Sequence, residues 1–135
     1  MALIDVADAV ADQLGTISGL RAYKASKTPD SINDLPAVVV LIGPTLYNSA
    51  FAGEYDHTLR VMLLLSKADT PSAYKRLFDY ISPAGSKSVP LKLETDPSFG
   101  GLCDTSLVGD NSGAGQTMWG GVPYLSSVWE LQILM

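Results

Sequence analysis

The residue of this sequence best suited to proton transfer or metal binding is its only histidine, His57. Glu54 and Asp56 lie beside it in the chain and would be the other ligands of a metal site. These residues read as part of a strand, however, and a strand points Asp56 and His57 to opposite faces. Metal sites also usually combine several His or Cys ligands, whereas this chain has one of each. We therefore predict no metal or other cofactor, and we expect His57 to be partly buried or at an interface.

A serine-containing segment, Gly109–Gly113 (GDNSG), is similar to the Gly-Asp-Ser-Gly around the nucleophile of trypsin-like serine proteases. Asn111 separates the acidic residue from Ser112, which breaks the match. A serine nucleophile also needs a base that a third group orients, and His57 is the only histidine available. A chain of 135 residues is too short for a protease of two barrels. Because Gly, Asp, Asn and Ser favour turns, residues 110–115 are predicted to form a flexible turn.

The remaining reactive side chains form no recognisable catalytic pattern. Glu94 and Asp96 are close in the chain, but nothing in the sequence places them in a pocket, so a solvated polar face is the better interpretation. The glycines between positions 109 and 121 follow neither of the two common nucleotide-binding patterns. Cys103 is expected to be a small buried hydrophobic residue. We predict no catalytic residue, and we predict that the protein is not an enzyme.

The composition favours one soluble domain that spans residues 1–135. The chain has 47% hydrophobic residues, which is ample for one core. Its 9 Lys and Arg against 14 Asp and Glu give a net charge of −5, which argues against tight binding to phosphate backbones. One cysteine cannot form an intrachain disulfide. The longest apolar runs, Ala37–Ile42 and Val61–Leu65, are far shorter than the ~20 residues of a membrane span, so no membrane partner is predicted.

The first half of the chain is predicted to contain one helix and three strands. Apolar residues recur every three or four positions over Leu3–Leu14, which indicates an amphipathic helix that ends at Gly15. A short strand is predicted at Leu20–Lys24, and a β-branched run predicts a buried strand at Ala37–Ile42. Apolar and polar residues alternate over Glu54–Lys67. The alternation predicts a long strand with one solvated face at its start and two buried faces at its end.

The second half is predicted to contain two helices and two strands. Thr70 as N-cap and Pro71 begin the first helix. Its apolar stripe consists of Tyr74, Leu77, Phe78 and Ile81. The second helix is predicted at Val89–Thr95 with Ser88 as its cap, and the strands at Leu102–Val108 and Tyr124–Leu134. Helices grouped in this way favour an α+β fold, in which a mostly antiparallel sheet packs against two or three helices in one compact domain.

Two predicted loops carry large apolar side chains. The connection Gly43–Gly53 contains Leu46, Tyr47 and Phe51, and Met118 and Trp119 precede the pair Gly120-Gly121. Aromatic residues and Met are enriched at the cores of protein interfaces. These five apolar residues are therefore candidates for a subunit or partner interface. The alternative, that both loops fold back onto the core, stays open.

The order of several sequence blocks along nearly the whole chain resembles a family of phage proteins. Each block is a weak signal alone. The blocks are Gly19-Leu20-Arg21-Ala22-Tyr23 after the first helix, Val38–Pro44, Ser66–Ile81, Ser88-Val89, Asp96–Gly101 and Val122–Leu125. In this order they resemble the small neck proteins of siphophages that infect actinobacteria, which are tail terminators or head-to-tail connector proteins. Pro90 and the Met118-Trp119 segment depart from the pattern of that family.

The resemblance implies a structural virion protein that forms a ring, typically hexameric in tail terminators. Such a ring caps the tail tube at the head-proximal end of the tail, and it joins the tail to the head. The implied partners are further copies of the chain, the major tail tube protein and a head-side connector protein, with assembly in the bacterial cytoplasm. Double-stranded DNA would pass through without specific binding. An acidic lumen would avoid trapping the DNA, and its candidate residues are Asp5, Asp8, Asp12, Glu54 and Asp56.

Three alternatives to a tail terminator remain open. The nearest is another neck protein, a stopper or an adaptor on the head side. The next is a small α+β module that binds a small molecule or a peptide, for which we would expect an enclosed apolar pocket with a few convergent polar groups. A hydrolase is the third, and it would need a cleft that holds titratable groups with perturbed pKa values.

Overall fold

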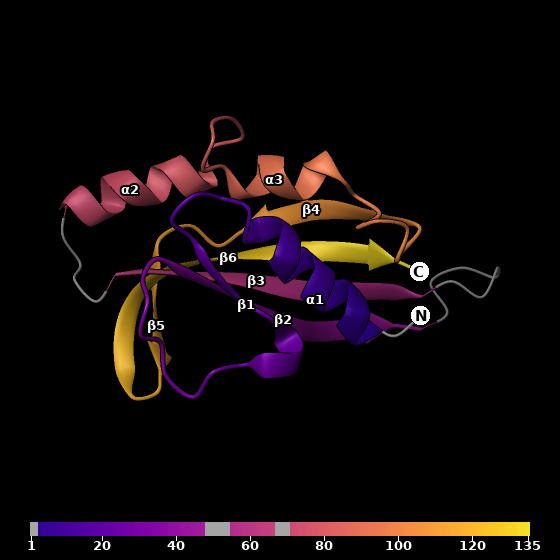
Figure 1. Ribbon diagram of the computed structural model, residues 1–135, viewed down its shortest axis with the longest axis horizontal. Coiled ribbons are helices and arrows are strands. Elements are labelled where there is room, and N and C mark those ends of the chain that lie inside the picture. Colours follow the sequence, from indigo (N-terminus) through magenta and orange to yellow (C-terminus); the bar gives the residue numbers. More distant parts are fainter. Residues whose placement is uncertain (1–2, 48–54, 67–70) are drawn as a thin grey trace.

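A sheet forms the centre of the computed structural model, which describes residues 3–47, 55–66 and 71–135. Within these segments six strands pair in the order β1-β2-β3-β6-β4, and β5 also pairs with β6 (Figure 1). Every pair is antiparallel except β1 with β2, which is parallel. The predicted α+β class with a mostly antiparallel sheet is therefore confirmed. The elements are α1 (Leu3–Leu14), β1 (Arg21–Tyr23), the 3-10 helix η1 (Ala25–Lys27), β2 (Ala37–Leu46), β3 (Asp56–Ser66), α2 (Pro71–Ile81), α3 (Val89–Thr95), β4 (Thr105–Asn111), β5 (Gly115–Trp119) and β6 (Val122–Leu134).

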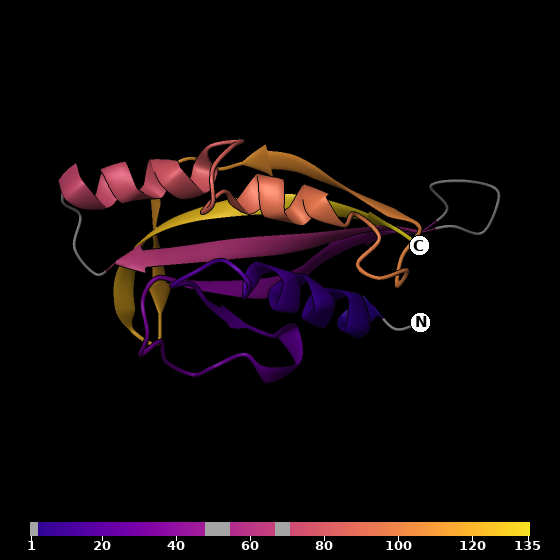
Figure 2. The same cartoon turned by 45° about the horizontal axis from the view of Figure 1, so that its top comes forward.

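The three α-helices of the described segments share one hydrophobic core with the same face of the sheet (Figure 2). Helix α1 occupies the bounds predicted from its periodicity and buries the stripe that contains Val6, Val10 and Leu14. Residues of α2 and α3, among them Leu77 and Leu93, complete this core. None of the helices in these segments is long and apolar enough to span a bilayer.

Strand β3 confirms the alternation predicted for it. Leu59, Val61 and Leu63 point into the core under the helices, while Arg60 between them is exposed. Near the end of the strand the other face is buried as well, because Leu64 belongs to a second apolar cluster on the opposite side of the sheet. As predicted, β3 therefore has one solvated face at its start and two buried faces at its end.

The second cluster is closed by the hairpin of β5 and β6. Its members include Ile32, Val39 and Tyr124, and Trp119 packs against it. The Trp119 indole Nε1 donates a hydrogen bond to the Pro29 carbonyl at 3.0 Å. Strand β6 is long enough to pair with β4 along one part and with β5 along the other, so β4 and β5 follow each other along the same edge of β6. The hairpin tip thus folds back over the sheet face that the helices leave uncovered.

Several predicted boundaries are wrong. Residues 43–46 belong to β2 and not to a loop, Asp110 and Asn111 belong to β4, and Gly115 begins β5. Strand β4 begins at Thr105 rather than at Leu102, because residues 101–104 form a turn in which the Cys103 amide donates a hydrogen bond to the Ser98 carbonyl at 3.2 Å. The short helix α3 matches its prediction, with Leu91 N donating to the Ser88 hydroxyl at 3.1 Å.

The buried side of α2 also differs from its prediction. Ala73, Leu77 and Tyr80 are buried, whereas Tyr74 is 38% exposed and Phe78 is 66% exposed. The predicted stripe and the observed one share Leu77, and Ile81 also packs against the core while half-buried. Tyr74 and Phe78 instead lie on the adjacent, exposed side of the helix. Because apolar residues lie on both sides of α2, the packing of this helix against β3 and α3 decides which side is buried. Phe78 is consequently left on the surface.

Candidate functional site

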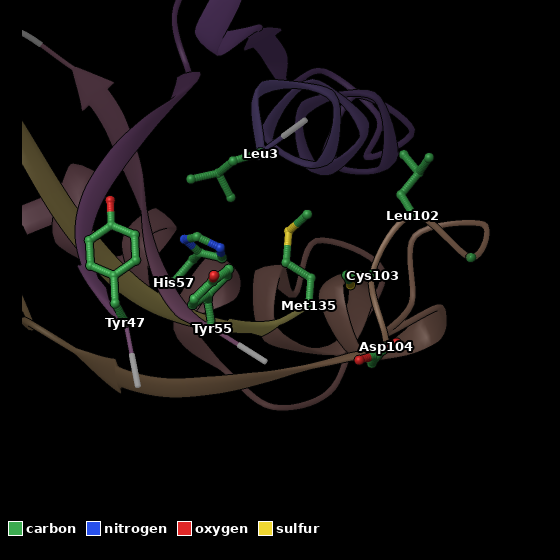
Figure 3. Close-up of a pocket in the computed structure, with 9 residues that line it drawn as sticks. Leu3, Tyr47, Tyr55, His57, Leu102, Cys103, Asp104 and Met135 are labelled. Atoms are coloured by element: carbon green, nitrogen blue, oxygen red, sulfur yellow. The ribbon is translucent and has the colours of Figure 1, made fainter. Parts of the chain in front are cut away.

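A pocket of about 560 Å³ opens at the end of the molecule where α1 begins and β6 ends (Figures 1 and 3). The start of α1, the segment after β2, the start of β3, the turn before β4 and the residue after β6 meet there. In Figure 3, Tyr47, Tyr55 and His57 form one side of the pocket, and Leu102 and Asp104 lie on the other side. Its lining residues are Leu3, Tyr47, Tyr55, His57, Gly101, Leu102, Cys103, Asp104 and Met135.

Three aromatic rings stand edge to face along one wall of the pocket. The rings of Tyr47 and Tyr55 are 5.5 Å apart at an interplanar angle of 74°, and those of Tyr55 and His57 are 6.2 Å apart at 65°. Edge-to-face packing of this kind is favourable because a positive ring edge meets a negative ring face. Tyr47 is nevertheless 63% exposed and Tyr55 43% exposed. The cluster is therefore held in place and still presents its apolar surface to solvent.

The backbone around a β-bulge positions this aromatic wall. The register of β2 against β3 shifts between Ile42 and Thr45. Thr45 then faces His57, and its Oγ1 lies 2.9 Å from the ring Nδ1. On the other side of β3, Tyr55 and Met135 exchange two backbone hydrogen bonds, of 2.9 and 3.3 Å. The His57 ring is thus oriented by a hydroxyl group, and Tyr55 is fixed by the strand pairing.

The opposite wall contains the only cysteine, Cys103, which is 7% exposed. Its Sγ lies 3.6 Å from the carbonyl oxygens of Pro97 and Ser98. Burial, followed by the charges of Asp104 and Asp96, raises the pKa of the Cys103 thiol. The nucleophilic form of cysteine is the thiolate, which a raised pKa disfavours. Cys103 therefore packs as a small apolar side chain, as predicted.

The pocket is suited to holding an apolar group. Across the described segments, no group of three or more His, Cys, Asp and Glu side chains is arranged to hold a metal ion. Within the described segments His57 contacts the Thr45 hydroxyl and the Tyr55 ring, and neither is a carboxylate that would orient a catalytic base. Aromatic and aliphatic side chains form most of the lining, with two tyrosine hydroxyls and one carboxylate beside them. Such a surface favours an aromatic or aliphatic group through burial of apolar area.

The five predicted interface residues are not gathered in one place. Tyr47 lines the pocket, Leu46 precedes it in β2, and Phe51 lies outside the described residues. Met118 and Trp119 belong to β5, so their predicted loop position is wrong. Figure 1 places β5 at the far end of the molecule from the pocket. Met118 is 63% exposed, whereas the Trp119 side chain packs against its own chain.

The sequence interpretation missed most of the pocket residues. Tyr55 had a visible signal, because it alternates with His57 on the same face of the predicted strand. Leu3, Leu102, Asp104 and Met135 had none. They come from three distant segments, and only the folded chain brings them together.

The acidic residues proposed for a lumen have different surroundings. Asp5 is exposed and Asp56 is half-buried, while Glu54 lies outside the described residues. Asp8 accepts hydrogen bonds from the Ser26 amide at 3.1 Å and from its hydroxyl at 2.7 Å. Asp12 lies 3.5 Å from the Lys24 ammonium. Asp8 and Asp12 therefore join α1 to the segment after β1, and their lumen role stays a prediction.

We expect Asp8 to make the stability of the fold depend on pH. Burial on its own would raise the pKa of Asp8, but the hydrogen bonds from Ser26 and the charge of Lys24 outweigh it and lower the pKa. A carboxyl group with a lowered pKa stabilises the fold above the unfolded-state pKa, and this stabilisation is lost as the pH falls through the folded-state pKa. The Asp8→Asn variant should therefore lose less stability than the parent between about pH 5 and pH 2.

Urea unfolding at a series of pH values measures this difference. Asp5→Asn is the matched control, since Asp5 lies on the same helix and is exposed. The effect should be small, because Asp8 is near the surface and solvent screens its interactions. An Asp8→Asn variant with the same pH dependence as the parent would contradict the assignment.

A scan of the chain against protein-family models and a search of curated proteins both find no match.

Proposed function

We propose that this protein is a structural subunit of a tailed-bacteriophage particle. In this proposal, copies of the chain form a ring, hexameric as in the tail terminators that the sequence resembles. The ring lies at the head-proximal end of the tail, ends the tail tube and joins it to the head. It is assembled in the cytoplasm of the host and remains in the virion. No catalytic step and no cofactor are part of this function.

The main structural support for the proposal is the exposed aromatic wall of the pocket. Tyr47 and Tyr55 are ordered against each other and against His57, yet large parts of both tyrosines face solvent. Tyrosine at this exposure is typical of surfaces that a protein partner covers. A ring requires such a surface on each subunit, and the block order along the sequence favours a phage ring.

The proposed partners follow from the same role. Copies of the chain contact each other within the ring, the major tail tube protein lies on one side of it and a head-side connector protein on the other. Double-stranded DNA passes through the centre without specific binding. The net charge of −5 is consistent with this passage, because like charge keeps phosphate groups from adhering to the subunits.

The oligomeric state of the purified chain tests the proposal. We expect native mass spectrometry to find one closed oligomer, and negative-stain images to show rings with a central opening. Addition of the tail tube protein should place the ring at the tube end. A chain that remains monomeric at high concentration, both alone and with tube protein, would contradict the proposal.

A ligand-binding module is the second candidate function, and the size of the pocket is the observation that favours it. About 560 Å³ is within the range of small-molecule sites, which is roughly 300–1,000 Å³. Fragment screening by NMR separates the two functions. The ring proposal predicts that fragments bound beside Tyr55 and His57 compete with assembly, whereas a ligand-binding module would bind them without any effect on the oligomeric state.

A further inference from the structure

The exposed face of α2 is a second apolar surface, distant from the pocket. Phe78 is 66% exposed, and Tyr74, one turn earlier on the same side of the helix, is 38% exposed. We call the surface of these two residues the α2 stripe. Figures 1 and 2 show α2 beginning at one end of the long axis and the pocket elements meeting at the other. The molecule therefore has an exposed apolar stripe on the half that contains α2 and an apolar pocket at the opposite end.

The charges around the two surfaces have opposite signs. Lys75 and Arg76 are exposed on α2, and helical spacing places Lys75 one turn from Phe78 but Arg76 on the far side of the helix from it. The Lys87 ammonium lies 6.0 Å from the ring of Tyr80, which is on the buried side of α2. Asp79 is the acidic residue of the helix itself. The pocket lining contains Asp104 and neither Lys nor Arg. Asp5, two residues after Leu3, is exposed and adds negative charge at that end, whereas Asp56 lies on the face of β3 opposite to His57.

We propose that the α2 stripe of one copy docks into the pocket of the next copy, with Phe78 against the Tyr47–Tyr55 wall. This inference rests on the proposed ring, and it names the partner of the pocket as a second copy of the chain. A contact between two different surfaces of identical subunits is head to tail, and it repeats until it closes into a ring. Aromatic packing supplies the apolar part of the contact, and Lys75 beside Phe78 against Asp104 sets its orientation.

Single substitutions on the two surfaces test the proposed contact. We expect Phe78→Ser and Tyr47→Ser each to weaken self-association by at least about thirtyfold, as the loss of a central aromatic contact does. The matched control is Leu107→Ser, because Leu107 on β4 is 67% exposed and belongs to neither surface. Its self-association should stay within about twofold of the parent. Sedimentation velocity over a concentration series gives these values, and thermal unfolding by circular dichroism checks that each variant is folded.

A mixture of the two variants is the sharper experiment. The Phe78→Ser chain keeps an intact pocket, and the Tyr47→Ser chain keeps an intact α2 stripe. In the mixture, the intact α2 stripe of the Tyr47→Ser chain can dock into the intact pocket of the Phe78→Ser chain, but the reverse contact is lost. We therefore expect pairs with one copy of each chain and no larger assembly. Native mass spectrometry resolves such pairs if one chain is isotope-labelled. A mixture that stays monomeric while the parent assembles would overturn the inference.

The outcomes separate this inference from the proposed function. Closed rings that form equally well with Phe78→Ser contradict the docking of α2 and leave the ring in place. Parent assemblies that depend on Phe78 and Tyr47 but do not close support the docking and contradict the ring. A parent chain that is monomeric at all concentrations contradicts both.

Discussion

Replacing Trp129 with alanine is expected to remove a large part of the stability of the fold. Trp129 is 2% exposed and lies in β6, the strand between β3 and β4. It is in register with Val61 on one side and with Asn111 on the other. Truncation of a buried tryptophan costs about 3–5 kcal/mol through lost burial and the cavity that remains. Small domains have about 5–15 kcal/mol of stability, so the variant should be marginally folded.

Urea unfolding followed by far-UV circular dichroism measures this loss. Trp129→Phe is the matched control, because it keeps an aromatic ring in the core and should retain most of the stability. Leu107→Ala, on the exposed part of β4, should change the free energy of unfolding by no more than about 0.5 kcal/mol. If Trp129→Ala unfolds at the urea concentration of the parent, the central position of this side chain in the core is wrong.

Replacing Gly120 with alanine is expected to displace the tip of the β5–β6 hairpin. Gly120 has φ +57°, which disfavours any residue with a Cβ. A Cβ at this position would also lie 2.8 Å from the Asp30 carbonyl oxygen, a backbone atom that cannot move without its neighbours. Strain and overlap together should lower the free energy of unfolding by about 3 kcal/mol. The Trp119 Nε1 bond to Pro29 should be lost with them.

The adjacent glycine provides the control for this effect. Gly121 has φ +80°, but its Cβ would meet no atom within 4 Å. Gly121→Ala should therefore show the backbone strain alone, about 1 kcal/mol. In a Trp129→Phe background Trp119 is the only tryptophan, so its fluorescence reports the position of the tip, and its emission should shift towards the red in Gly120→Ala only. Equal losses of stability in the two variants would mean that the hairpin tip does not contact the segment around Asp30.

The elements whose apolar residues define a single buried side were predictable from sequence. The apolar stripe of Leu3–Leu14 and the alternation along β3 each indicate which side of the element faces the core, and the structure buries that side. The capping serine of α3 is equally local, because Ser88 Oγ bonds to a backbone group three residues away. For these elements the structure agrees with the prediction in type and closely in bounds.

The elements whose sequence is compatible with two different structures were not predictable. Helix α2 has apolar residues on adjacent sides, so its sequence permits burial of either Phe78 or Tyr80. The segment after Ile42 contains Gly43 and Pro44, which usually end a strand, yet a bulge lets β2 continue opposite His57. Met118 and Trp119 precede two glycines and were predicted in a loop, whereas β6 pairs with them. Partners distant in the sequence decided each case.

The sequence by itself therefore determined the α+β class, the first helix and the long central strand, because these depend on patterns within about a dozen residues. Its local motifs also argue against protease, nucleotide-binding and metal chemistry at His57 and Gly109–Gly113. The tertiary structure alone decided where the pocket lies and that Phe78 is left uncovered. The pocket joins Leu3, Tyr55 and Met135 from opposite parts of the chain. No local sequence pattern predicts that these residues lie together, because their proximity depends on how the strands pair.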